Sequence, residues 1–135
     1  MNRSFTLIIT GILCLFLAAS TQAQETGIAS YYHDGLKGYK MANGERYNPD
    51  KLTCAHPTAP LGSIVKIARK DNPDLSVIAT VSDRGPFVKG RIIDLSKRAA
   101  GEIGILKEGI AEVVVMIIKR PTDYIPGIVA ADDDK

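Results

Sequence analysis

Two aspartates, each at the end of an apolar run, are the residues best placed to carry out chemistry. Asp83 follows the β-branched run 77–81, and Asp94 follows Ile92 and Ile93. The loop between them contains Gly85-Pro86, a strong turn signal. A strand end holds a side chain on a rigid frame and leaves its tip exposed, as acid–base catalysis requires. Two carboxylates so placed can cleave a glycosidic bond, one of them protonating the leaving oxygen.

The same aspartates also fit structural roles. An aspartate at the start of a turn often accepts a hydrogen bond from its own backbone. Asp94 stands directly before residues 95–100 and could cap a helix there. Chemistry at Asp83 and Asp94 is therefore a hypothesis, and turn and cap functions are its alternatives.

Glu45 is a further candidate acid. It follows Asn43-Gly44, a strong signal for a tight turn. Asp83 could pair with Asp94 or with Glu45. In either case the pKa of the proton donor would have to be raised by burial or by a nearby like charge.

His56 is a candidate base. Pro57 favours an extended backbone at His56. The imidazole could orient or polarise a carboxylate or act as the base itself, and the alternative is a buried histidine bonded to a carbonyl group. A zinc site through His56, His33 and Cys54 would be short of ligands. We therefore expect no metal and no other cofactor.

Polar and aromatic residues of the same loops are candidates for binding a sugar. Hydroxyl and amide groups of a sugar could be bound by Asn43, Arg84 and the backbone N–H of Gly85. The flat C–H faces of pyranose rings could stack on Tyr31, Tyr32 and Tyr47. Arg84 is equally suited to an ion pair with Asp94, and tyrosines also fill the surfaces of small barrels.

Composition predicts one globular domain. The chain has 135 residues, of which 45% are hydrophobic and 24% are charged, and its formal net charge is +2. Such a balance does not predict nucleic-acid binding. Between Gln24 and Arg120 there are 15 basic and 11 acidic residues, a mild positive bias that suits an anionic polymer. We expect a monomer.

The N-terminus has the pattern of a secretory signal peptide over residues 1–23. Arg3 supplies the positive charge, residues 7–19 are apolar, and Thr21-Gln22-Ala23 offers small residues for cleavage before Gln24. We expect export to the periplasm or cell envelope, with membrane contact only through an uncleaved signal segment. Lipid attachment at Cys14 is a minor alternative. Cleavage leaves Cys54 as one unpaired thiol, which we expect to be buried.

The mature chain predicts short strands separated by turns. We expect strands over residues 27–32, 64–69, 76–81 and 111–118, further extended segments near residues 52–56 and 92–94, and a helix over 96–103. A polar hairpin loop over 70–74 joins two of the strands. This pattern favours a small, mainly β barrel of six strands with one short helix over residues 24–120. Residues 121–135 are interpreted as a mobile acidic tail.

Five stretches resemble the rare lipoprotein A (RlpA) family in their order and spacing: residues 27–32, 42–47, 52–62, 82–87 and 90–96. The resemblance implies a six-stranded double-psi β-barrel, as in the expansins. It also implies an endolytic lytic transglycosylase that acts on peptidoglycan glycan strands, preferably those without stem peptides, and leaves 1,6-anhydro-muramic ends. No cofactor is implied.

The resemblance assigns roles by position. Asp83 matches the proton shuttle of the family, with Glu45 and His56 as assisting residues, and Asp94 matches a carboxylate that the related expansins need. Many members carry a lipobox and a C-terminal repeat of the SPOR type, and neither pattern is expected here. A non-catalytic, expansin-like glycan-binding module is the alternative function, and a secreted inhibitor or toxin-like barrel is a third.

Overall fold

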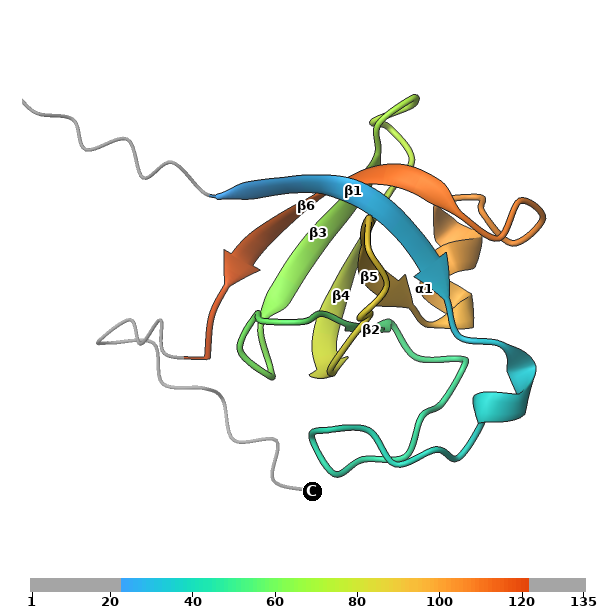
Figure 1. The fold of residues 1–135 in the computed structure, drawn as a ribbon, viewed down its shortest axis with the longest axis vertical. Coiled ribbons are helices and arrows are strands. Elements are labelled where there is room, and N and C mark those ends of the chain that lie inside the picture. The colour runs from blue at the N-terminus through green and yellow to red at the C-terminus, as the bar shows by residue number, and fades with distance from the viewer. Residues whose placement is uncertain (1–22, 122–135) are drawn as a thin grey trace, which may run out of the picture.

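The computed structural model describes residues 23–121 (Figure 1). The predicted signal peptide (1–23) and the predicted tail (121–135) lie outside this range except for Ala23 and Pro121. The elements in chain order are β1 (Gln24–Tyr31), the 3-10 helix η1 (Asp34–Leu36), β2 (Thr53–Ala55), β3 (Ile64–Arg69), β4 (Ser76–Asp83), β5 (Arg91–Leu95), α1 (Lys97–Glu102) and β6 (Ala111–Lys119).

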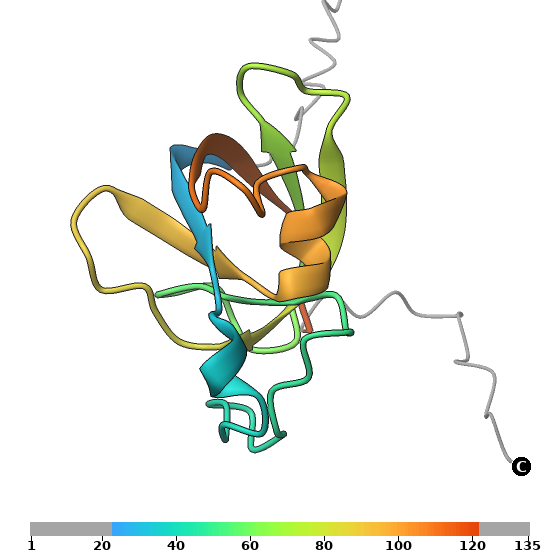
Figure 2. The same cartoon turned by 90° about the vertical axis from the view of Figure 1, so that its right-hand side faces the viewer.

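The strands close into a barrel in the order β1-β5-β2-β4-β3-β6 (Figures 1 and 2). Two neighbouring pairs are parallel, β1 with β5 and β2 with β4. The other neighbours run antiparallel. Closure gives each strand a neighbour on both sides, so none of the six strands has an edge that is free over its whole length. The predicted six-stranded double-psi β-barrel with one short helix is confirmed.

Alternating side chains fill the barrel. Val65 and Ile67 on β3 are buried, whereas Lys66 between them is exposed. Ile67 lies opposite Val77 on β4 and Val115 on β6, and both of these are also buried. A barrel of this size is filled by its own side chains. Ligands therefore have to bind at the loops and strand ends.

The predicted strands are present with adjusted ends. The hairpin over residues 64–81 is confirmed, with β3 and β4 antiparallel. The β-branched run of β6 lies between β1 and β3, as expected of a central strand. β1 begins at Gln24 rather than at Gly27, because Gln24 and Glu25 pair with residues of β6. Sequence patterns alone did not indicate this extension.

Helix α1 is capped by Ser96 and not by Asp94. The Ser96 hydroxyl accepts a hydrogen bond from the backbone N–H of Ala99 at 3.2 Å. Gly104 follows the helix with a φ of 72°, in the left-handed region that glycine adopts without strain. The helix-cap interpretation of Asp94 is therefore wrong, and its carboxylate has other partners.

The long connection between β1 and β2, residues 32–52, extends from one end of the barrel in both views (Figures 1 and 2). It contains η1 and then folds back on itself through a bridge between Lys40 and Arg46. Met41 and Tyr47 are its buried apolar side chains. The backbone N–H of Asn43 donates to the carbonyl of Ser82 at 3.1 Å, which fastens the connection to the end of β4.

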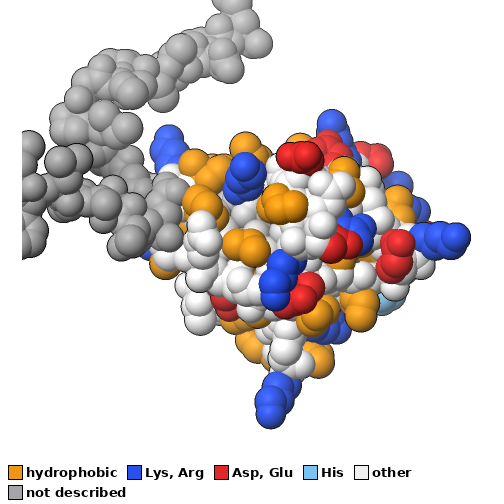
Figure 3. All heavy atoms as spheres, turned by 90° about the horizontal axis from the view of Figure 1, so that it is seen from above, with side chains coloured by type: hydrophobic (Ala, Val, Ile, Leu, Met, Phe, Trp, Pro, Cys, Tyr) orange, Lys and Arg blue, Asp and Glu red, His pale blue; other side chains and the backbone are white. Residues whose placement is uncertain are grey.

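The surface carries charges of both signs. Basic, acidic and apolar side chains are interspersed on the face seen in Figure 3, as the small net charge of +2 leads one to expect. In the range 23–121, the helices are too short and too polar to cross a membrane.

Cys54 is buried as expected, and we predict that it reacts with thiol reagents only in the unfolded protein. It is 2% exposed on β2, and burial raises the pKa of its thiol from 9.0 to about 12. The folded thiol therefore stays protonated and inert near pH 8. A colorimetric disulfide reagent should label Cys54 in concentrated urea and not in native buffer; rapid labelling of native protein would contradict this.

The same shift predicts the direction of a pH effect on stability. Because the folded pKa lies above the unfolded one, the contribution of Cys54 is fully present below about pH 9 and is lost as pH rises toward about 12. Urea unfolding across this range should show a smaller loss of stability for Cys54→Ala than for the wild type.

Candidate active site

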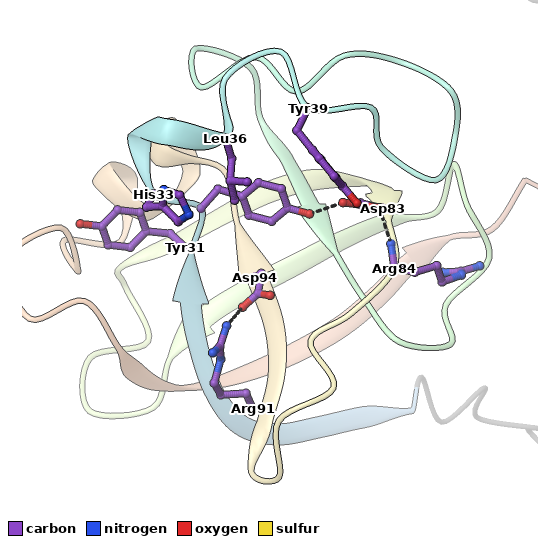
Figure 4. Close-up of a pocket in the computed structure, with 9 residues that line it drawn as sticks. Tyr31, His33, Leu36, Tyr39, Asp83, Arg84, Arg91 and Asp94 are labelled. Carbon is purple, nitrogen blue, oxygen red and sulfur yellow. Dashed lines mark hydrogen bonds and ion pairs between the residues drawn. The ribbon is translucent and has the colours of Figure 1, made fainter.

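An open pocket of about 380 Å³ lies where β1 and β4 end, beside β5 and residues 32–52 (Figure 4). Its walls are formed by Tyr31, Tyr32, His33, Leu36, Tyr39, Asp83, Arg84, Arg91 and Asp94. Two of the four predicted catalytic residues, Asp83 and Asp94, therefore line one pocket. The other two, Glu45 and His56, are not among its lining residues.

A bulge determines how Asp83 leaves the end of β4. Cys54 pairs with Val81, whereas Ala55 pairs with Asp83, so Ser82 is an extra residue on β4. A bulge interrupts the alternation of a strand and redirects the side chains that follow, commonly beside functional sites. Asp83 is 6% exposed, and it reaches the pocket from the edge of the barrel core.

Three donors hold the Asp83 carboxylate. Its Oδ1 accepts the backbone N–H groups of Ala42 and Arg84, each at 2.9 Å. Its Oδ2 accepts the hydroxyl of Tyr32 at 2.5 Å. Both amides bind the same oxygen, so Oδ2 is the atom suited to exchanging a proton with a ligand in the pocket.

Tyr32 has a role that the sequence did not reveal. It was a candidate for stacking on a sugar, but its ring packs against Tyr47, with ring centroids 4.6 Å apart, and its hydroxyl binds Asp83. Burial, and then the hydrogen bond to Asp83, raises the pKa of Tyr32 far above its ordinary value of 10.0. Tyr32 therefore remains a protonated donor to Asp83 throughout the neutral range.

Asp94 is held from two sides. Its Oδ1 accepts hydrogen bonds from the Ser30 hydroxyl and from Nη2 of Arg91. Residues three apart on a regular strand point to opposite faces. The pairing of β1 with β5 passes from Arg91 to Ile93 between consecutive residues of β1, so Ile92 is an extra residue that breaks the alternation. This irregularity brings Arg91 and Asp94 to the same side.

The two aspartates lie on opposite sides of β2 at the same level. Ala55 of β2 pairs with Asp83 on β4 and with Asp94 on β5. Two strand spacings separate their backbones by roughly 10 Å. A ligand of the size of a sugar unit lying across this end of β2 can therefore contact both carboxylates.

His56 faces a different cavity. Its ring lines a cavity of about 280 Å³ with Glu25, Thr58 and residues of β6. Nε2 lies 2.9 Å from Oε2 of Glu25. Nδ1 accepts the backbone N–H groups of Thr58 and Ala59 at 3.1 and 2.9 Å. The expected alternative, a histidine bonded to a carbonyl group, is not what the ring contacts show.

Glu45 and Asn43 belong to an exposed turn of the 32–52 connection. Asn43 Oδ1 accepts the backbone N–H of Glu45 at 3.0 Å, the geometry of an Asx turn. The turn signal in the sequence was therefore correct. Both side chains are exposed, and neither belongs to the walls of the pocket.

The side chain of Arg84 has structural contacts. Its Nη1 donates to the carbonyl oxygens of His56 and Ala59 at 3.2 and 2.5 Å, and Figure 4 shows it directed away from Asp94. The proposed Arg84–Asp94 ion pair is not formed; Arg91 pairs with Asp94 instead. Gly85, with a φ of 107°, does not line the pocket.

The two remaining candidates for stacking on a sugar, Tyr31 and Tyr47, have different surroundings in the structure. Tyr47 is 3% exposed, and its hydroxyl accepts the backbone N–H of Lys97 at 3.1 Å, so its ring is a structural element. Tyr31 lines the pocket and donates its hydroxyl to the carbonyl of Leu106 at 2.9 Å. Of the two, Tyr31 is the one placed to contact a ligand.

Sequence reasoning missed several walls of the pocket. Tyr39, which is 50% exposed, joins His33 and Leu36 on one side, and Arg91 lies beside Asp94. The available signal was their position: three of them lie in the loop directly after the first strand, and Arg91 lies three residues before Asp94. Within residues 23–121, no three His, Cys, Asp or Glu side chains are arranged to hold a metal ion.

Comparison with known protein families gives one match that spans most of the barrel. The family model described as lytic transglycolase matches residues 24–115.

Curated relatives match the same part of the chain. An endolytic peptidoglycan transglycosylase RlpA of Pasteurella multocida is 50% identical over 93 residues, which are 69% of this chain and 31% of the relative. Proteins with the same name from Campylobacter jejuni and Rickettsia felis are 48% and 46% identical, with 68% and 73% of this chain covered. The chain spans between 31% and 44% of the length of these three relatives.

Solved structures share the fold. A Streptomyces papain inhibitor superposes with a TM-score of 0.57 at 23% identity, over 72% of this chain and 96% of its own. A variant of an expansin from Clavibacter michiganensis, in complex with cellohexaose, gives a TM-score of 0.56 at 18% identity, over 76% and 54%. At these identities the similarity shows the fold alone.

Tyr32→Phe should destabilise the protein by about 1–3 kcal/mol, because it removes a hydrogen bond to a buried carboxylate. Urea unfolding monitored by circular dichroism measures the change. Tyr39→Phe, at a half-exposed ring of the same pocket, is the matched control and should alter the unfolding free energy by less than about 0.5 kcal/mol. Equal effects of the two substitutions would show that the Tyr32 hydroxyl does not secure Asp83.

Proposed function

This chain belongs to the lytic transglycolase family, and we propose that it is an endolytic peptidoglycan lytic transglycosylase. The substrate is the glycan strand of alternating N-acetylmuramic acid and N-acetylglucosamine, preferably without stem peptides. The single observation that carries the proposal is Asp83, a carboxyl fixed by two backbone amides and a tyrosine at the wall of an open pocket. The names of the curated relatives support the reaction type.

One carboxyl group suffices for the proposed reaction. Protonated Asp83 gives its proton to the glycosidic oxygen as the bond from that oxygen to C1 of the muramic acid breaks. The 6-hydroxyl of the same muramic acid then attacks C1 and loses its proton to the Asp83 carboxylate. The products are a 1,6-anhydro-muramic end and a free hydroxyl on the leaving sugar. The acid is regenerated, and no water is consumed.

The hydrogen bonds of Asp83 fit this exchange. The amides of Ala42 and Arg84 bind Oδ1 in both protonation states, so the carboxyl keeps its orientation while the proton moves at Oδ2. Tyr32 donates to Oδ2 when the group is ionised. Preorganised donors of this kind stabilise charge without reorganisation during the reaction.

Besides Asp83, the substrate contacts Asp94 and aromatic residues of the pocket. The Asp94 carboxylate stands across β2 from Asp83, where it can stabilise the positive charge that develops at the sugar ring. Tyr31 and the half-exposed Tyr39 offer aromatic faces for sugar rings. We propose that Glu45 and His56 assist from outside the pocket, Glu45 from the exposed turn of residues 43–45.

The substrate implies a location. Peptidoglycan lies outside the cytoplasm, so we propose that the protein acts in the cell envelope as a monomer after export and cleavage before Gln24. The expected glycan partner also agrees with the bias of 15 basic over 11 acidic residues between Gln24 and Arg120.

Digestion of purified glycan strands that lack stem peptides tests the proposal. The chain from Gln24 onward should release short fragments with anhydro-muramic ends, identified by mass spectrometry. Ordinary reducing ends would mean hydrolysis instead. Binding without any product would favour the glycan-binding alternative.

Asp83→Asn separates catalysis from binding. The amide cannot carry the proton, so turnover should fall by about 100-fold or more while glycan binding in a pull-down assay is retained. Asp71→Asn is the control, since Asp71 is exposed, pairs with Arg69 and does not line the pocket. Unchanged turnover in Asp83→Asn would make Asp83 a turn residue only.

A further inference from the structure

His56 and Glu25 pair at 2.9 Å, and the proposed reaction gives His56 an assisting role from outside the pocket but gives Glu25 none. The His56 side chain is 7% exposed and that of Glu25 is 48% exposed, with 2.9 Å between Nε2 and Oε2. Nδ1 accepts two backbone N–H groups, from Thr58 and Ala59. An acceptor at Nδ1 leaves the proton on Nε2 in the neutral ring, so His56 donates to Glu25.

The contacts of the imidazole order the loop that follows β2. By accepting N–H groups two and three residues ahead, Nδ1 closes a tight turn over residues 56–59. This turn presents two carbonyl oxygens, those of His56 and Ala59, in one direction. Both accept Nη1 of Arg84.

Arg84 connects this loop to Asp83. Its guanidinium is bound by the loop, and its backbone N–H is one of the two amides on Oδ1 of Asp83. In addition, the backbone N–H of His56 donates to the carbonyl of Asp83 at 3.1 Å. Displacement of the loop would therefore shift both the Asp83 backbone and a donor to its carboxylate.

We infer that Glu25 is a positioning residue for Asp83, acting through His56, and that His56 holds the loop rather than transferring a proton. This inference rests on the proposed function for its kinetic consequence. Its physical basis is that the His56 ring faces a cavity lined by Glu25 and β6, whereas Asp83 and Asp94 line the other pocket. Both ring nitrogens are engaged there, so neither faces the proposed substrate.

The loop offers a substitution that separates the two roles of His56. The side-chain oxygen of an asparagine readily accepts backbone N–H groups two and three residues ahead, the bonds that Nδ1 accepts here. An asparagine carries no exchangeable charge near neutral pH. His56→Asn therefore keeps the turn and removes any proton transfer, whereas His56→Ala removes both.

The experiment measures kcat and KM on glycan strands together with amide hydrogen exchange at Thr58 and Ala59. His56→Ala and Glu25→Ala should each lower kcat by about tenfold, leave KM within about twofold and speed exchange at both amides. Glu25→Gln can still accept a hydrogen bond from Nε2 and should stay within about threefold of the wild-type kcat. His56→Asn keeps the turn but loses the contact with Glu25, so its kcat should fall no further than that of Glu25→Ala, and its pH profile should keep its shape. The double alanine variant should be no slower than His56→Ala.

Glu112→Ala is the matched control. Glu112 is 50% exposed and lies 2.8 Å from Lys70, so it resembles Glu25 in exposure and pairing but lies outside the pocket. It should change neither kcat nor the exchange of Thr58 and Ala59.

Two results would overturn the inference. One is a His56→Asn variant as inactive as Asp83→Asn, since His56 would then carry a proton. The other is a Glu25→Ala variant whose amide exchange rates at Thr58 and Ala59 equal those of the wild type, since Glu25 would then not order the loop. An inactive wild type would refute the proposed function alone, and the exchange rates of Glu25→Ala would still decide whether Glu25 orders the loop.

Discussion

The fixation of the Asp83 carboxylate is the interaction on which the rest of the site depends. Its three donors come from separate parts of the chain: Ala42 in the long connection, Arg84 just after β4, and Tyr32 just after β1. One carboxyl group thereby joins the connection to the ends of two strands. A buried carboxylate without such donors would be strongly destabilising. The geometry of the pocket and the stability of this end of the barrel thus have a common origin.

The barrel topology brings these parts together. The pairing register places the C-terminal ends of β1 and β4 at one level of the barrel, because Ser30 pairs with Asp94, Asp94 with Ala55, and Ala55 with Asp83. Each parallel pair also contains a register shift, one next to Asp83 and one next to Arg91 and Asp94. Both acidic groups therefore reach the pocket through local departures from regular strand geometry, at the edge of a core that the regular parts of the same strands fill.

The sequence predicted the barrel because its strands are short, β-branched and bounded by turn residues. It also placed Asp83 and Asp94 correctly near the ends of strands, because each follows an apolar run and precedes residues that favour a turn or a helix start. The register shifts could not be seen, because one extra residue such as Ser82 or Ile92 is itself apolar or small and does not disturb the pattern. The pairing of Arg91 with Asp94 depends on such a shift, as three-residue spacing on a strand otherwise separates side chains.

The direction of the His56 side chain could not be predicted from the sequence either. The preceding residue, Ala55, pairs with both Asp83 and Asp94, yet the His56 ring turns toward Glu25 near the start of β1. That contact spans 31 residues, and it follows from closure of the barrel rather than from any local preference. Tyr31 and Tyr32 are adjacent in sequence, and this suggested the same function, stacking on a sugar ring, for both. Alternation along the chain gives them different ones: Tyr31 binds the carbonyl of Leu106, whereas Tyr32 packs on Tyr47 and donates to Asp83.

The packing of Tyr32 extends the support of Asp83 to the helix. Tyr47, against which Tyr32 packs, accepts the backbone N–H of Lys97 at the start of α1. Ser96, the cap of that helix, donates its hydroxyl to the carbonyl of Lys51 at 2.6 Å, close to the start of β2. The helix, the long connection and two strand ends are therefore held in one hydrogen-bonded and packed unit. The proton transfer proposed for Asp83 requires a carboxyl group held within a few tenths of an ångström of its productive position. The long connection folded over one end of the barrel supplies part of that support, through the backbone N–H of Ala42.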